Sequence, residues 1–192
     1  MSHRLFVAIR PPAAVRAALV GLMGGVADAR WQTDAQLHAT LAFLGEVDRH
    51  RANAIAEQLA HVRFAPFPVQ LDGFGTFDNA RGRITSLWTG LSPREKLAAL
   101  AARISTVLLP VGVPLPTRRF VPHVTIARFP ARGAAPASLS RFLAGRTPPA
   151  IAWEVERFSL LESHLGGEGA HYAEIACYPE AVTESSADRR RW

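Results

Sequence analysis

The chain has 192 residues, of which 48% are hydrophobic and 20% are charged, the composition of a globular protein with a sizeable core. No apolar run approaches the roughly 18 residues of a membrane span, and the single cysteine, Cys177, excludes an intrachain disulfide and a cysteine-rich zinc site. The 21 arginines and one lysine outnumber the 16 acidic residues and give a net charge of +6, which is compatible with an RNA partner without indicating one.

The first part of the chain alternates strand-like and helix-like segments. Residues 4–9, RLFVAI, are an apolar β-rich run closed by two prolines, and the run is too short for a signal-peptide core, so we expect a cytoplasmic protein. Apolar residues at helical spacing follow and end at two consecutive glycines. A second strand is predicted over 37–44, closed by Gly45, and a helix over 50–62.

The middle of the chain predicts a hairpin followed by a helix. Strands over 67–77 and 83–91 are joined by the turn signal Asp-Asn-Ala-Arg-Gly. Ser92 is expected to cap the next helix, with Pro93 at its first position and its end near Leu109.

The last part of the chain again carries strand-like runs. Its expected elements are a strand over 121–129, a short helix over 139–143, one long strand over 151–163 and a final strand over 171–178. Residues 183–192 are polar and predicted to be a disordered tail. Because no linker divides the chain, we predict one domain over 1–182 whose two halves pack as two lobes.

One short repeat relates the two halves. The segment LHATLA at 37–42 matches PHVTIA at 122–127 in the order His, any residue, Thr, aliphatic, Ala. The two histidines, His38 and His123, lie almost half the chain apart, as an old duplication of one unit would leave them. Both copies lie in apolar, strand-like runs, which makes a chance match improbable.

The spacing inside the repeat suits phosphate chemistry. Side chains at positions i and i+2 of a strand share a face, so His38 points with Thr40 and His123 with Thr125. One neutral imidazole can take a proton from water while one imidazolium protonates a departing ribose oxygen. The threonine hydroxyls can donate to the non-bridging phosphate oxygens, where negative charge develops.

Two other interpretations of the histidines are weaker. Each histidine taken alone would more often be a hydrogen-bonded strand residue, but the matched context of the pair argues against that. A zinc site lacks an obvious third ligand and any H-E-x-x-H pattern, so we predict no metal.

The segments LHATLAFLGEV and RRFVPHVTIARF closely resemble the two signature segments of the 2H phosphoesterase superfamily. More specifically, they resemble the bacterial and archaeal RNA 2′,3′-cyclic phosphodiesterases, historically called 2′-5′ RNA ligases. The resemblance covers nearly the whole chain, including the opening RLFVAI and a C-terminal run beginning FSLLESHL.

The resemblance implies an α+β fold with two pseudo-symmetric lobes of antiparallel sheet, flanked by helices around a central groove. It implies catalytic roles for His38 and His123, phosphate binding by Thr40 and Thr125, and two further substrate-binding residues, Arg128 on the phosphate and Phe43 in the nucleotide pocket. The implied reaction hydrolyses 2′,3′-cyclic phosphate ends of RNA or nucleotides to 2′-phosphates without a cofactor. The sequence leaves open which histidine is the acid and which the base; we favour His123 as base and His38 as acid. We expect a monomer without membrane association.

Two alternatives stay open. The same site would serve a 2′-5′ RNA ligase or 2′-5′ phosphodiesterase, because ligation from a cyclic phosphate reverses 2′-5′ cleavage. A module that binds RNA ends without turnover is the other possibility, although a binder has no need of two proton-transfer groups.

Arg128 poses a geometric problem. It lies an odd number of residues after His123, so regular alternation would turn it to the opposite face of the strand. A role at the phosphate therefore requires a bulge or bend after Ile126, or the end of the strand there.

Several further residues carry weaker hypotheses. Arg118 and Arg119 either contact an RNA backbone or are solvated. Trp31 and Trp88 could stack on bases, but buried tryptophans are the commoner outcome. We expect structural roles for His164, His171 and Cys177.

Overall fold

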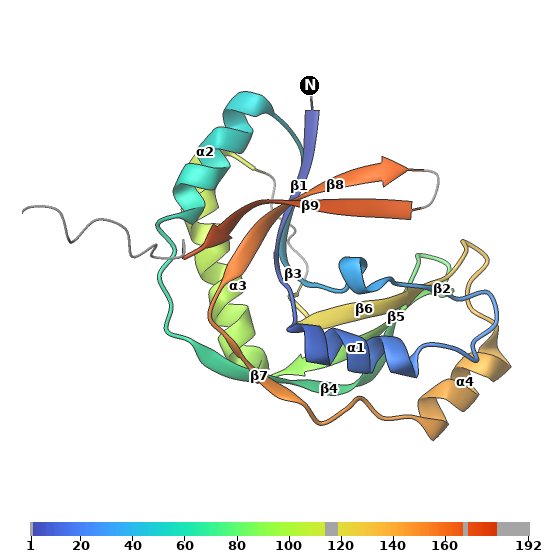
Figure 1. Cartoon of the computed structure of the whole chain (residues 1–192). Coiled ribbons are helices and arrows are strands. Elements are labelled where there is room, and N and C mark those ends of the chain that lie inside the picture. The colour runs from blue at the N-terminus through green and yellow to red at the C-terminus, as the bar shows by residue number, and fades with distance from the viewer. Residues whose placement is uncertain (1, 114–118, 167–168, 180–192) are drawn as a thin grey trace, which may run out of the picture.

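The computed structural model describes residues 2–113, 119–166 and 169–179. Two antiparallel sheets form its frame (Figure 1). The four-stranded sheet has the order β3 (Ala39–Asp48), β1 (Ser2–Ile9), β8 (Phe158–Gly166) and β9 (Gly169–Tyr178). The five-stranded sheet has the order β2 (Arg30–Trp31), β6 (His123–Arg128), β5 (Ile84–Ser92), β4 (Phe67–Asp78) and β7 (Ala152–Val155).

The helices flank these sheets, as an α+β fold requires. They are α1 (Ala13–Leu22), α2 (Arg49–Leu59), α3 (Arg94–Leu108) and α4 (Pro136–Gly145), with short 3₁₀ turns η1 (Asp34–Gln36) and η2 (Leu109–Val111). Helices α2 and α3 pack on each other and on β3, whereas α4 lies by the five-stranded sheet (Figure 1). Among the described residues, no helix combines the length and apolarity needed to cross a membrane.

A single hydrophobic cluster holds both sheets and all four helices together. It includes Val7 and Leu41 from the four-stranded sheet, Leu87 and Ile126 from the five-stranded sheet, and Leu100 from α3, each 5% exposed or less. Burial of apolar side chains in such a cluster is the main source of folding free energy. Because the cluster is continuous, the two sheets are fixed relative to each other, and so are the residues that they carry.

The strand expected over 151–163 is two strands in different sheets. Its first part, β7, pairs with β4, and its second part, β8, pairs with β1. The chain therefore passes from one sheet to the other between Val155 and Phe158. Alternation within a run of residues carries no information about which sheet each part joins, so the sequence could not show this break.

This crossing also corrects the expectation that each half of the chain forms one lobe. The four-stranded sheet combines the N-terminal β1 and β3 with the C-terminal β8 and β9. The five-stranded sheet takes β2 from the N-terminal part and its other strands from residues 67–155. The α+β class with two antiparallel sheets is confirmed, but the lobes are not sequence halves.

Smaller corrections concern the ends of elements. Gly45 does not close its strand: it has φ +71°, pairs with Leu5, and β3 continues to Asp48. Ser92 does not cap α3, because its backbone pairs with Gln70 at the end of β5 and Pro93 stands at the cap. The helix expected over 139–143 extends over the whole of α4. The predicted tail, 183–192, lies outside the described residues.

Candidate active site

His38 stands immediately before β3, where the 3₁₀ turn η1 delivers the chain into the strand. Its Nδ1 lies 2.7 Å from the carbonyl oxygen of Gln36. A carbonyl only accepts hydrogen bonds, so Nδ1 carries the hydrogen and Nε2 is the basic nitrogen of the neutral ring. The ring packs between Phe6 and Tyr172, at centroid distances of 4.9 and 5.0 Å.

His123 begins β6 and repeats this arrangement. Its Nδ1 lies 2.7 Å from the carbonyl oxygen of Val121, again two residues earlier in the chain. Its ring packs against Phe77 at 4.8 Å and Trp88 at 5.7 Å. The two histidines therefore have the same tautomer, and each bonds to the carbonyl two residues earlier and packs against its own pair of aromatic rings.

A β-bulge in β6 places Arg128 on the histidine face. Thr125 and Ala127 pair with consecutive residues of β5, so Ile126 between them has no partner. Ile126 and Ala127 are both buried, and Arg128 then emerges on the same side as His123. The bend that Arg128 required is thus present, because the extra residue of a bulge resets the alternation of side chains.

The same bulge occurs in the first motif. Thr40 and Ala42 pair with consecutive residues of β1, which leaves Leu41 unpaired. Leu41 and Ala42 are buried, and Phe43 emerges 41% exposed on the side of Thr40. Phe43 and Arg128 are therefore equivalent positions of the two motifs, each five residues after its histidine.

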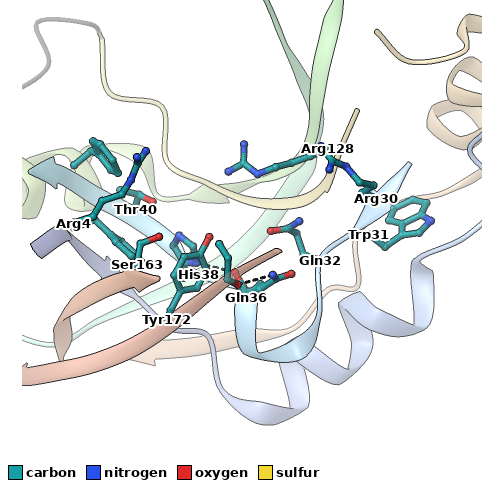
Figure 2. A pocket seen from close by; sticks show the side chains of 13 residues that line it. Arg4, Arg30, Trp31, Gln32, Gln36, His38, Thr40, Arg128, Ser163 and Tyr172 are labelled. Atoms are coloured by element: carbon teal, nitrogen blue, oxygen red, sulfur yellow. Dashed lines mark hydrogen bonds between the residues drawn. The ribbon is translucent and has the colours of Figure 1, made fainter. Parts of the chain in front are cut away.

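The strands of the two motifs, β3 and β6, approach each other where the sheets meet. A cavity of about 570 Å³ opens there. His38, Thr40, Phe43 and Arg128 line it (Figure 2). His123 and Thr125 do not line this cavity; they share the face of β6 that carries Arg128.

Burial sets the protonation of both histidines. It is the main cause of the lowered pKa of His38, which falls from the usual 6.5 to about 4. The hydrogen bond to the Gln36 carbonyl opposes this shift, whereas the charges of Arg128 and His123 add to it. Burial also lowers the pKa of His123, and Arg128 again adds to the effect. The positive charge of Arg128 therefore acts on both rings.

Sequence reasoning missed several residues that line the cavity. These are Arg4, Phe6, Arg30, Gln32, Gln36, Ser163, Ala170 and Tyr172. Arg4 and Phe6 carried a usable signal, since positions i and i+2 of the first predicted strand share a face. Arg30 and Tyr172 carried none, because only the pairing of distant strands brings them here.

The weaker hypotheses have mixed outcomes. Trp31 is half-buried, packs on Phe142 and lines the cavity, and Trp88 is half-buried against His123. Cys177 is a half-buried strand thiol, as expected. His164 and His171 pair across β8 and β9 outside the cavity, Arg119 is exposed, and Arg118 lies outside the described residues.

In the part of the chain that the structure describes, no three His, Cys, Asp or Glu side chains are grouped so as to hold a metal ion.

Comparison with known proteins identifies the family. The sequence model of the 2′-5′ RNA ligase superfamily matches residues 11–167, which include both histidine motifs and both bulges. The chain belongs to the 2′-5′ RNA ligase superfamily. The resemblance that the two signature segments carry is thereby confirmed.

Two relatives match this chain over most of their own length. The RNA 2′,3′-cyclic phosphodiesterase of Thermus thermophilus is 34% identical over 184 residues, covering 88% of this chain and 86% of the relative. That of Archaeoglobus fulgidus is 28% identical over 178 residues, covering 91% and 99%. The crystal structure of Escherichia coli LigT complexed with 3′-AMP superposes with a TM-score of 0.77 at 25% identity, covering 94% of this chain and 99% of that one.

Proposed function

We propose that this protein is an RNA 2′,3′-cyclic phosphodiesterase that opens the cyclic phosphate to a 2′-phosphate with His38 and His123 as its acid/base pair. The observation that carries the proposal is the matched setting of the two rings, in which each Nδ1 is bound to a backbone carbonyl and Nε2 is the basic nitrogen. Membership of the superfamily and the names of the relatives support the substrate class.

The reaction needs one proton removed and one delivered. The base takes a proton from water, the water oxygen attacks phosphorus, and the P–O3′ bond breaks. The acid gives its proton to the departing 3′-oxygen, so the products are a 2′-phosphate and a free 3′-hydroxyl. Each turnover leaves the two histidines with exchanged protonation, and exchange with water restores them.

The pKa values favour the reverse of the sequence-based assignment of roles. With a pKa of about 4, His38 is neutral at pH 7 and suited to accept the proton of water. His123 then holds the proton for the leaving oxygen. A bound phosphate assists this, because an anion close to an imidazole raises its pKa and counteracts the effect of burial and of Arg128.

The remaining residues act on the phosphate and the nucleoside. Thr40 and Thr125 are proposed to donate hydroxyl hydrogen bonds to its non-bridging oxygens, and Arg128 to neutralise the charge that develops there. Phe43 offers an exposed ring at the equivalent position of the other motif, where a nucleobase can stack. None of these steps requires a metal ion.

The test is turnover of adenosine 2′,3′-cyclic phosphate in EDTA, with the product identified by chromatography. We expect undiminished activity and release of 2′-AMP. A protein carrying both His38→Ala and His123→Ala, purified identically, controls for contaminating nuclease. Loss of activity in EDTA that zinc or manganese restores would refute the metal-independent mechanism, and a 3′-AMP product would show that the substrate lies in the site in the opposite direction.

A further inference from the structure

The cavity holds more positive charge than one cyclic phosphate requires. Arg4, Arg30 and Arg128 all line it, and the residues that line it include no aspartate or glutamate. Among the described residues, none of the three has a carboxylate partner, although Arg10 and Arg16 nearby both pair with Asp34. A 2′,3′-cyclic phosphate carries a single negative charge, which Arg128 is placed to meet.

Arg30 and Arg128 stand directly opposite each other. They are register partners in the antiparallel pair of β2 and β6, so their side chains leave the sheet on the same face. Figure 2 shows both on one side of the cavity, with Arg4 on the other. Like charges at directly opposed positions destabilise a sheet, and an anion held between or beside them removes that cost.

The chemistry of an RNA end supplies such an anion. The terminal nucleotide carries the cyclic phosphate on its 2′ and 3′ oxygens, and the rest of the RNA continues from its 5′-oxygen through a second phosphate. A nucleoside 2′,3′-cyclic phosphate without a 5′-phosphate lacks this group. Gln32, two residues after Arg30 and also lining the cavity, adds an amide donor to the same strand edge.

We propose that Arg30 forms a second anion subsite, which binds the phosphate on the 5′-oxygen of the terminal nucleotide. This inference rests on the proposed function and extends it to substrate choice: the protein selects ends that belong to a nucleic acid chain over isolated cyclic nucleosides. Arg128 binds the reacting cyclic phosphate, and Arg30 binds the phosphate on the 5′-oxygen of the same nucleotide.

The kinetic test compares adenosine 2′,3′-cyclic phosphate with the same molecule bearing a 5′-phosphate. We expect the natural protein to have the higher kcat/KM for the 5′-phosphorylated substrate. A charge-assisted contact of this kind corresponds to a preference of about 10- to 100-fold. Arg30→Ala should bring the ratio of the two kcat/KM values close to one, and Arg30→Lys should keep part of it.

Two matched variants control for the loss of a positive charge. Arg132→Ala removes an arginine that pairs with Asp28 outside the cavity and should leave the ratio unchanged. Arg4→Ala removes the arginine on the other side of the cavity and should also leave the ratio of the two kcat/KM values unchanged. If Arg4→Ala abolishes the preference and Arg30→Ala does not, or if the natural protein shows no preference, the proposal is wrong.

A binding measurement separates this proposal from the proposed function. Calorimetry with 2′-AMP and with adenosine 2′,5′-bisphosphate needs no turnover. Tighter binding of the bisphosphate to the natural protein, lost in Arg30→Ala, supports the subsite even if no hydrolysis occurs. Equal affinity for the two nucleotides overturns the subsite even if hydrolysis is fast.

Discussion

At His38 and His123, the same local hydrogen bond leaves Nε2 as the basic nitrogen of the neutral ring. Each ring donates a hydrogen bond from Nδ1 to the backbone carbonyl oxygen two residues earlier in the chain. Such a bond fixes both the tautomer and the ring orientation without using a carboxylate. Burial is the main cause of the lowered pKa values of both rings, and it makes both easy to deprotonate.

Removing either histidine should disable catalysis. General acid–base groups contribute about 10²- to 10⁴-fold each, so His38→Ala and His123→Ala should each lower kcat by that amount. Because the two act in one step, the double variant should lose little beyond the worse single variant. The measurement is kcat on the cyclic nucleotide, with circular dichroism to verify folding; a folded single variant with near-normal turnover contradicts the pair.

The pH dependence of kcat/KM should be bell-shaped and displaced to acidic pH. Activity falls on the acidic side when the base becomes protonated, near pH 4 if the base is His38. It falls on the alkaline side when the acid loses its proton, below pH 6.5 in the free protein because burial lowers the pKa of His123. His38→Ala should lose the acidic limb; loss of the alkaline limb instead would restore the opposite assignment.

The placement of Arg128 depends on the β-bulge at Ile126, which adds one unpaired residue to β6. Arg128→Ala should lower kcat/KM about 10- to 100-fold, since it removes a charged donor from the reacting phosphate. Arg128→Lys should recover part of the loss, and Arg141→Ala, at an exposed site on α4, should have no effect. Unchanged kcat and KM in Arg128→Ala would remove this residue from the site.

Among the secondary-structure elements, β3 and β6 share one feature, a β-bulge directly after the threonine of each motif. A bulge after the threonine buries two consecutive residues and turns the next side chain back toward the histidine face. The start of β3, with His38 immediately before it, and the strand β6 thus each present three side chains on one face. Regular alternation would have buried Phe43 and Arg128 in the core.

The hairpin of β4 and β5 supports His123 through a close contact. A Cβ added at Gly75 would lie 2.2 Å from atoms of the Trp88 ring, which itself packs on His123. Gly75→Ala should therefore displace the indole, lower the free energy of unfolding by about 1–3 kcal/mol and reduce kcat. Chemical denaturation and steady-state kinetics measure the two effects.

The matched control is Gly21→Ala in α1, where no heavy atom lies within 4 Å of the added Cβ. This substitution should stabilise the protein by about 0.5–1 kcal/mol and leave kcat unchanged. If Gly75→Ala is as stable and as active as the natural protein, the indole does not position His123.

At the scale of the whole molecule, the chain crosses between the two sheets more than once. Residues 1–92 hold β1 and β3 of one sheet but β2, β4 and β5 of the other. Residues 93–179 hold the strands that complete both. Neither fragment can therefore build a closed core, because each leaves central strands without a partner and hydrophobic faces without cover.

We expect neither the 1–92 nor the 93–179 fragment to show a cooperative unfolding transition alone. A protein truncated after residue 179 keeps every strand that the structure describes and serves as the control, with a single transition. Urea titrations followed by circular dichroism measure this. A cooperative transition in either fragment would show that one lobe folds independently.

Strong local signals in the sequence were enough to predict several helices and strands and to single out the residues proposed to carry the chemistry. Hydrophobic periodicity depends on contacts within one strand or helix, so β1, α1, α2 and the β4–β5 hairpin were predictable. The repeated His-x-Thr pattern pointed to the site because proton transfer and phosphate binding require those side chains at that spacing. Even the bulge before Arg128 followed from alternation, once a role for that arginine was assumed.

Tertiary structure alone decided which sheet each strand joins, and with it the surroundings of the site. The split of 151–163 between two sheets, the aromatic partners of both histidines and the opposition of Arg30 and Arg128 all arise from pairings between residues far apart in sequence. The pKa of His38 belongs to the same class, because the burial that lowers it comes from the packing of distant strands. Local sequence carries no record of such neighbours, since long-range pairing is selected by the free energy of the whole core.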